Sequence, residues 1–273
     1  MSTHIEFTII VTDIAQREML IALLSAAGAS GFEEEKDRLK AFVPEADYPG
    51  ELFDKIIKDK ALNYSKSLIK EKNWNAEWEA DFKPVVVGSF CAIRAAFHTA
   101  NSTVAHDIVV TPKMSFGTGH HATTFMMVQA MEQIEFQRKS VFDFGTGTGV
   151  LAILAEKLGA SAITAIDNDD WSITNATENF NSNNCDKILL DKNQGIATYG
   201  SFDIILANIN RHVILASLPL IKQHLAVHGV VLFSGLLIGD AEVVIAAAKE
   251  QQLNLERQWE TGGWICLQMA NSK

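Results

Sequence analysis

SVFDFGTGTGVLAILAEKLGASAITAID, residues 140–167, carries the most informative pattern in this chain. An apolar run leads into the glycine-rich turn GTGTG (145–149), a helical run follows, and a second apolar run ends on Asp167. Glycines in such a turn permit positive φ angles and let a ligand approach the backbone closely. In an open α/β sheet, the turn between a strand and the next helix is where ligands bind. The stretch therefore predicts a binding site at the end of a strand.

The spacing of these glycines disfavours a dinucleotide and excludes a P-loop. A dinucleotide site reads G-x-G-x-x-G/A, but here the third glycine comes one position early and Val150 replaces the last small residue. No G-x-x-x-x-G-K-[ST] sequence is present. A nicotinamide-dependent oxidoreductase is therefore a remote alternative.

Asp167 follows the turn by about twenty residues, the spacing at which an acid accepts hydrogen bonds from both hydroxyls of a ribose. The alternative is that Asp167 merely starts a loop and caps the helix that begins near Trp171. With the glycine turn in its expected place upstream, the ribose role is the favoured interpretation.

The regular alternation of strand-like and helical runs after residue 140 predicts a mostly parallel sheet with helices on both faces. A terminal hairpin over 256–270 is expected at the sheet edge. The N-terminal part follows another order, with a strand at 5–11, a helix at 14–28, a hairpin, a helix at 50–60 and a strand at 62–70. This β-α-β-β-α-β order predicts a small ferredoxin-like α+β unit.

Between these parts lies KNWNAEWEADFKP, which we interpret as a connector because it combines two tryptophans with dense charge. The expected division of the chain is an N-terminal domain (1–71), the connector (72–84) and a larger α/β domain (85–273). The seven methionines, including Met126, Met127 and Met131 at helical spacing, are expected in the core. Trp264, in the terminal hairpin, is expected to serve packing.

Composition narrows the class of protein. The 273 residues carry a formal net charge of −10. This charge argues against non-specific binding to nucleic acid and suits a basic partner. No stretch approaches the roughly 20 apolar residues of a membrane span. The N-terminus lacks the pattern of a signal peptide, and the three cysteines lie far apart. We expect a soluble, cytoplasmic protein, acting as a monomer, with reduced thiols.

A second glycine-rich loop stands upstream in VVTPKMSFGTGHHATT, residues 109–124. It runs into His120 and His121, and then into Thr123 and Thr124, which are expected to cap the following helix. Adjacent histidines cannot readily point at one ion, and no Cys, Asp or Glu stands beside them, so we expect no metal.

The turn and its acid resemble motifs I and II of class I S-adenosylmethionine-dependent methyltransferases, whose ligand has a ribose but no phosphate. The upstream loop resembles the F-G-T-G-x-H-x-T-T signature of the PrmA family, and the likeness extends over most of the chain, including DIILANI (203–209). This resemblance implies a Rossmann-like methyltransferase sheet and an N-terminal substrate-recognition domain. It also implies methyl transfer to amino groups of the large-subunit ribosomal protein numbered eleven, at the stalk base.

Matching the motifs residue by residue assigns roles in binding S-adenosylmethionine. Thr124 reaches the ligand from the loop, Gly145 gives backbone approach, Asp167 holds the ribose, and Asn208 lies at the methyl-transfer end. Further cofactor-binding candidates from the same motifs are Gly147, Phe116, Gly119 and Asp143, the last near the ligand's ammonium group. Asn208 is the catalytic candidate: its side-chain carbonyl would orient a neutral amine, with no dedicated general base.

Some positions depart from the family pattern. Thr111 stands in place of a common Asp, Lys113 in place of a Gly, and Asn210-Arg211 in place of apolar or aromatic residues. The segment also lacks the prolines and aromatic residue of the [DNS]-P-P-[YFW] motif, which disfavours a nucleobase as acceptor. A small-molecule acceptor and a non-catalytic adaptor that only binds the cofactor remain open.

Overall fold

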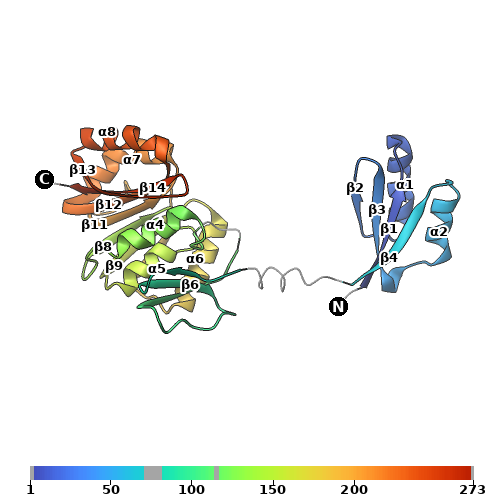
Figure 1. The fold of residues 1–273 in the computed structure, drawn as a ribbon, viewed down its shortest axis with the longest axis horizontal. Helices are drawn as coiled ribbons and strands as arrows, with labels where there is room; N and C mark the ends of the chain where they lie inside the picture. The colour runs from blue at the N-terminus through green and yellow to red at the C-terminus, as the bar shows by residue number, and fades with distance from the viewer. Residues whose placement is uncertain (1–2, 71–81, 114–116, 272–273) are drawn as a thin grey trace. The chain divides into compact units, whose positions relative to one another are not determined.

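The computed structural model of the chain describes residues 3–70, 82–113 and 117–271 (Figure 1). They belong to two units, 1–81 and 82–273, each with its own internal packing. Most of the expected connector 72–84 lies outside the described residues, so the expected division into three segments stays a prediction. No helix in the described ranges is long and apolar enough to cross a membrane.

In its described residues, the first unit is a four-stranded antiparallel sheet with two α-helices and one short 3-10 helix. Its elements are β1 (Thr3–Ile10), α1 (Ile14–Ala26), β2 (Gly31–Glu34), β3 (Arg38–Pro44), η1 (Glu45–Asp47), α2 (Glu51–Lys58) and β4 (Tyr64–Lys70). The strands lie in the order β2-β3-β1-β4. Alternate residues of β1 such as Phe7 and Ile9 are buried with Leu20, Leu24 and Phe53 of the helices. The predicted β-α-β-β-α-β order is confirmed.

The second unit holds a three-stranded sheet and a seven-stranded sheet. The elements that precede the glycine turn are β5 (Val85–Val87), β6 (Cys91–Ala95), β7 (His106–Val110), α4 (Ala122–Met131) and β8 (Ser140–Phe144). Those after it are α5 (Val150–Lys157), β9 (Ala162–Asp167), α6 (Asp170–Ser182), β10 (Ile188–Lys192), β11 (Phe202–Asn208), α7 (Arg211–His224), β12 (Leu225–Leu237), η2 (Ile238–Asp240), α8 (Ala241–Glu250), β13 (Leu253–Thr261) and β14 (Trp264–Asn271).

The seven strands lie in the order β10-β9-β8-β11-β12-β14-β13. Neighbours from β10 to β12 pair in parallel, and β14 and β13 add an antiparallel hairpin at the edge, as the sequence predicts. The strand order reverses at β8, which has β9 on one side and β11 on the other. That reversal is the topological switch point where ligands bind in open α/β sheets.

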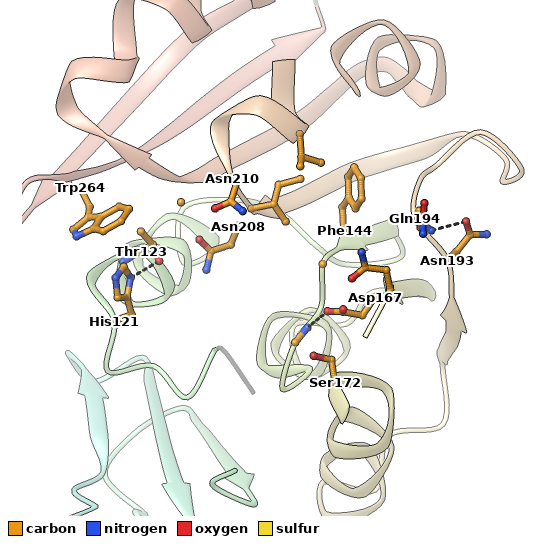
Figure 2. Close-up of a pocket in the computed structure, with 16 residues that line it drawn as sticks. His121, Thr123, Phe144, Asp167, Ser172, Asn193, Gln194, Asn208, Asn210 and Trp264 are labelled. Carbon is orange, nitrogen blue, oxygen red and sulfur yellow. Dashed lines mark hydrogen bonds between the residues drawn. The ribbon is translucent and has the colours of Figure 1, made fainter. Parts of the chain in front are cut away.

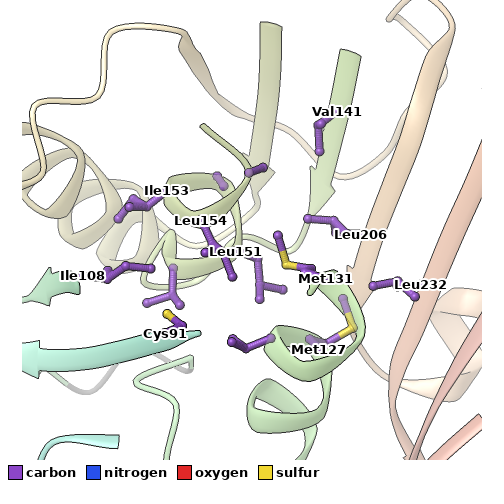
Figure 3. Packing of buried hydrophobic residues seen from close by; sticks show 14 of the residues in the cluster. Cys91, Ile108, Met127, Met131, Val141, Leu151, Ile153, Leu154, Leu206 and Leu232 are labelled. Atoms are coloured by element: carbon purple, nitrogen blue, oxygen red, sulfur yellow. The ribbon is translucent and has the colours of Figure 1, made fainter. Parts of the chain in front are cut away.

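Each face of this sheet has its own hydrophobic core, because successive strand residues point to opposite faces. Val141 of β8 belongs to the core formed with α4, α5 and the three-stranded sheet (Figure 3). Phe142, its neighbour in sequence, belongs to the core formed with α7 and α8. Met127 and Met131 lie in the first core and, like Met126 and Met269, are fully buried, as predicted. The prediction is wrong for Met19 of α1, which is 50% exposed, and Met1 and Met114 lie outside the described residues.

Candidate active site

The glycine turn after β8 adopts a backbone that only glycine tolerates easily. Gly145, Gly147 and Gly149 have φ angles of +73°, +54° and +82°. A Cβ on Gly145 would stand 2.5 Å from Cγ2 of Ile209. The amides of Gly145 and Thr146 both donate to the carbonyl of Ile166 at 2.9 Å, which ties the turn to the end of β9. The turn therefore presents the backbone of Gly145 and Gly147, without side chains, at the switch point.

Asp167 ends β9 beside this turn. Its Oδ2 accepts a hydrogen bond from the Gly147 amide at 2.9 Å, and its Oδ1 accepts one from the Asp169 amide at 3.1 Å. The helix α6 is capped by Asp169, whose Oδ2 accepts from the Ser172 amide at 3.0 Å. The alternative in which Asp167 caps this helix is thus wrong, and its carboxylate is available at the wall of a cavity.

That cavity has a volume of about 510 Å³ and is bordered by the turn at Gly145 and Gly147. Figure 2 shows two groups of side chains around it. One end is lined by Phe144, Asp167, Asn168, Ser172, Asn193 and Gln194. The other end is lined by His121, Thr123, Asn208, Ile209, Asn210 and Trp264. No lysine or arginine is among the described residues that line the cavity, which disfavours a phosphate-bearing ligand.

Asn208 is the last residue of β11, and only one of its two polar side-chain atoms has a hydrogen-bond partner among the described residues. Its Nδ2 donates to Oγ1 of Thr124 at 3.3 Å. Its Oδ1 is buried and has no hydrogen-bond partner within the described part of the chain. A buried carbonyl without a donor costs roughly 1–3 kcal/mol, so its position at a cavity wall indicates a ligand that supplies an N–H or O–H group.

Asp143 lies behind the turn and is not among the residues that line the cavity. Its side chain is almost fully buried, and Oδ2 accepts a hydrogen bond from Oγ1 of Thr146 at 2.6 Å. Burial, reinforced by the negative charge of Asp167, raises the pKa of Asp143 from 3.8 to about 7 against the opposing effect of the Thr146 hydrogen bond. Its Oδ1 has no partner among the described residues.

The second glycine loop is joined to the first. Oγ1 of Thr148 donates to the carbonyl of Gly117 at 2.9 Å. Gly119 packs against the three-stranded sheet, where a Cβ would stand 2.8 Å from Cδ1 of Ile93. Gly119 therefore shapes the loop and does not line the cavity. Phe116 lies outside the described residues.

The two histidines of this loop have separate structural contacts. His120 bonds to Oγ1 of Thr118 at 3.1 Å and to the Lys83 carbonyl at 2.8 Å. His121 caps α4, accepting from the Thr123 amide at 3.4 Å. The predicted threonine cap is wrong, because the helix already begins at Ala122 and both threonines lie inside its first turn. Within the described ranges, no three His, Cys, Asp or Glu side chains cluster in a way that could hold a metal ion.

Thr124 and Asn208 meet Gly145 at a small neighbouring cavity of about 10 Å³. The structure thus brings four of the predicted residues, Thr124, Gly145, Asp167 and Asn208, to the switch point, and Gly147 with them.

Sequence reasoning missed several residues of the cavity wall. Trp264 packs on the first core, as expected, but it also lines the cavity, with its ring edge-on to His121 at a centroid distance of 4.7 Å. Asn193 and Gln194 follow β10 at the opposite end. These residues carry no local motif, and the pairing of β14 with β12 is what brings Trp264 to the site.

The residues present fit a ligand with a ribose, an uncharged base and an amino-acid tail. The turn leaves room for a ligand backbone, and a two-oxygen acceptor stands at the end of β9. Asn208 lines the other end, with a buried Oδ1 that accepts no hydrogen bond from the described residues. This site at the switch point of this sheet defines a class I S-adenosylmethionine-dependent methyltransferase.

The chain belongs to the ribosomal protein L11 methyltransferase (PrmA) family, whose model matches residues 4–272. It is 34% identical over 258 residues to a ribosomal protein L11 methyltransferase of Porphyromonas gingivalis, covering 92% of this chain and 89% of that protein. A relative of the same name from Chlorobaculum parvum is 40% identical over 253 residues, covering 87% of this chain and 86% of that one.

A solved structure supports the same conclusion. The ribosomal protein L11 methylase from Lactobacillus delbrueckii subsp. bulgaricus aligns with a TM-score of 0.65 at 30% identity, covering 70% of this chain and 100% of that one. The predicted family, fold class and enzyme class are therefore confirmed: the chain is a methyltransferase that uses S-adenosylmethionine.

Proposed function

We propose that this enzyme transfers methyl groups from S-adenosylmethionine to amino groups of ribosomal protein L11, at lysine side chains, the N-terminal amine or both. The observation that carries the acceptor chemistry is the Oδ1 of Asn208, a residue of the cavity wall, which is buried and accepts no hydrogen bond from the described residues. An amine supplies the N–H group that this oxygen needs. The names of the relatives supply the protein substrate.

Cofactor binding falls to residues that the strands bring to one edge. Asp167 would hold the ribose hydroxyls, Gly145 and Gly147 would lie against the amino-acid tail, and Thr124 would support Asn208 from α4. Asp143 would act from behind the turn, toward the ligand's ammonium group. The bound cofactor supplies a methyl group on a sulfonium, whose C–S bond breaks as the new N–C bond forms.

The chain's own contribution is to present a neutral, oriented amine. A free lysine has a pKa of about 10.4, and an apolar environment lowers it by disfavouring the ammonium. Ile209, Val213 and Trp264 supply apolar surface at this end of the cavity. Asn208 accepts an N–H bond from the amine and turns its lone pair toward the methyl group. Alignment of this kind is worth several kcal/mol, up to ~10.

The remaining parts of the proposal concern recognition. The first unit is the proposed substrate-recognition domain, and L11 at the ribosomal stalk base is the proposed partner, without direct contact to nucleic acid. The net charge of −10 suits a basic ribosomal protein. We place the reaction in the cytoplasm, with the enzyme as a monomer.

The test uses purified enzyme, labelled S-adenosylmethionine and ribosomal extract from cells that lack this gene. Label should enter one small basic protein, in a protease-sensitive and nuclease-resistant form, and mass spectrometry should place it on amines of L11. Label in RNA or in small molecules would overturn the acceptor assignment. Cofactor binding without any transfer would favour a non-catalytic adaptor.

A further inference from the structure

Asn210 occupies the N-cap position of α7 but does not cap the helix. Asparagine is among the best N-cap residues, and its side chain normally accepts a bond from an amide of the first turn. Here the side chain makes no such bond, although its backbone has the extended conformation of a cap residue. The side chain instead lines the cavity, two residues beyond Asn208 (Figure 2). The Asn210 side chain therefore borders the cavity and does not stabilise the start of α7.

The backbone that carries Asn208 and Asn210 is held between two glycines. The side chain of Ile209 covers Gly145, where a Cβ would stand 2.5 Å from its Cγ2. The carbonyl oxygen of Ile209 lies over Gly235, where a Cβ would stand 2.4 Å from it. Gly235 has a φ of +79°, so this close approach depends on glycine. The backbone at Ile209, between Asn208 and Asn210, is therefore held by close packing.

The neighbouring threonines at this end of the cavity already have partners. Oγ1 of Thr123 bonds to Nδ1 of His121 at 2.8 Å, and Oγ1 of Thr124 accepts from Asn208. No Asp or Glu is among the described residues that line this end. The amide oxygens of Asn208 and Asn210 are thus the neutral acceptors suited to an incoming amine.

We infer that Asn210 is a specificity-determining residue that accepts a second N–H bond from the acceptor amine. This inference rests on the proposed function. A neutral primary amine has two N–H groups beside its lone pair and can satisfy both asparagines. A secondary amine has one, and a tertiary amine has none. Asn210 therefore favours amines that still carry hydrogen and speeds the first transfer relative to the third.

The experiment compares two forms of purified L11, one unmodified and one with its amines dimethylated by formaldehyde and borohydride. Single-turnover rates are measured with saturating S-adenosylmethionine for wild type, Asn210→Leu, which has nearly the same shape, and Asn210→Asp, which keeps an oxygen acceptor. Asn181→Leu, on the exposed face of α6, is the matched control.

Asn210→Leu should lower the rate on unmodified L11 about tenfold, the effect of one lost hydrogen bond, and change the rate on dimethylated L11 less than about twofold. Asn210→Asp should keep the wild-type preference for unmodified L11. The melting temperature of Asn210→Leu should match wild type, because no cap bond is lost.

If Asn210→Leu lowers the single-turnover rate equally on both forms of L11, or changes neither rate, the role of Asn210 is overturned. The proposed function would still stand. If wild-type enzyme methylates neither form of L11, the proposed function fails and this inference fails with it. The two failures are therefore distinguishable in one experiment.

Discussion

At the scale of single residues, the Asn208 side chain lowers the stability of the fold but serves the proposed activity. Its buried Oδ1 has no partner within the described chain, while its Nδ2 is held by Thr124. Folding gains nothing from such an oxygen, since an unmet buried acceptor costs free energy. Because Asn208 lines the cavity, the arrangement fits a ligand that supplies the missing donor.

Asn208→Ala should reduce the single-turnover rate about 100-fold, because the amine loses the group that orients it. The free energy of unfolding should stay the same or rise, since an unsatisfied carbonyl is removed. Rapid-quench kinetics and urea denaturation check the two effects. Asn181→Ala, exposed on α6, serves as control, and unchanged turnover in Asn208→Ala would exclude the role.

Asp167→Asn should weaken binding of S-adenosylhomocysteine about 30- to 100-fold. The substitution removes the negative charge and replaces one acceptor oxygen of the carboxylate by an NH2 donor. The matched control is Asp169→Asn, two residues away, since asparagine caps a helix as well as aspartate does. Titration calorimetry measures both affinities. Equal affinities in the two variants would contradict the proposed ribose contact.

Asp143→Asn should change how stability depends on pH. Burial raises the pKa of Asp143 from 3.8 to about 7, so the folded protein keeps a proton that the unfolded chain releases. Wild type therefore loses stability as pH rises through this interval, by up to about 1.4 kcal/mol per pH unit, and the loss is constant above it. Asparagine cannot ionise and escapes this loss.

Denaturation of the ligand-free protein at several pH values tests this prediction. The advantage of Asp143→Asn over wild type should grow from pH 4 to pH 7 and then level off. The exposed Asp186→Asn is the control. A constant difference across this range would mean that Asp143 titrates as an ordinary carboxyl.

At the scale of elements, α6 supports the site through a ladder of asparagines. Asn179 accepts from the Thr111 amide at 2.7 Å and donates to the Thr148 carbonyl at 2.8 Å. Asn175 donates to the Thr111 carbonyl, and Asn183 bonds both backbone groups of Val109. These asparagines thus provide hydrogen-bond partners for backbone groups at the end of β7 and in the glycine turn. Because Thr111 takes part through its backbone, its departure from the family pattern leaves these bonds intact.

Asn179→Leu should lower the free energy of unfolding by about 2–5 kcal/mol, because two buried backbone groups lose their partners. Equilibrium denaturation in urea measures this, with Asn181→Leu on the same helix as control. A loss below about 1 kcal/mol would show that water replaces the amide and that the ladder is dispensable.

At the scale of the whole molecule, the two units have separate cores, and every residue described at the cavity wall belongs to the second unit. A protein of residues 82–273 should therefore bind S-adenosylhomocysteine within about threefold of the full chain. It keeps Phe82 and Lys83, which contact His120.

The same truncated protein should lose most of its activity on L11, at least about 100-fold, since the proposed recognition domain is absent. Calorimetry and transfer of labelled methyl groups measure the two properties, with the full chain as reference. Full activity after truncation would favour a small-molecule acceptor.

Much of the fold was predictable because it depends on local patterns. The glycine turn and Asp167 lie where the alternation of strands and helices places them, and the hairpin ending in β14 forms the expected edge. The start of α4 was less predictable. The cap residue is His121, which has the extended backbone of a cap, and both threonines lie inside the helix.

The sequence by itself determined the class of protein, the family, and the residues at the ends of consecutive strands. Parallel strands bring their carboxyl ends to one edge, so Gly145, Asp167 and Asn208 meet wherever this alternation occurs. Tertiary structure alone decided the rest of the cavity wall. Trp264 arrives through long-range strand pairing, and two glycines distant in sequence, Gly145 and Gly235, pack against Ile209 beside Asn210. Such contacts depend on packing between distant segments, which no local pattern encodes.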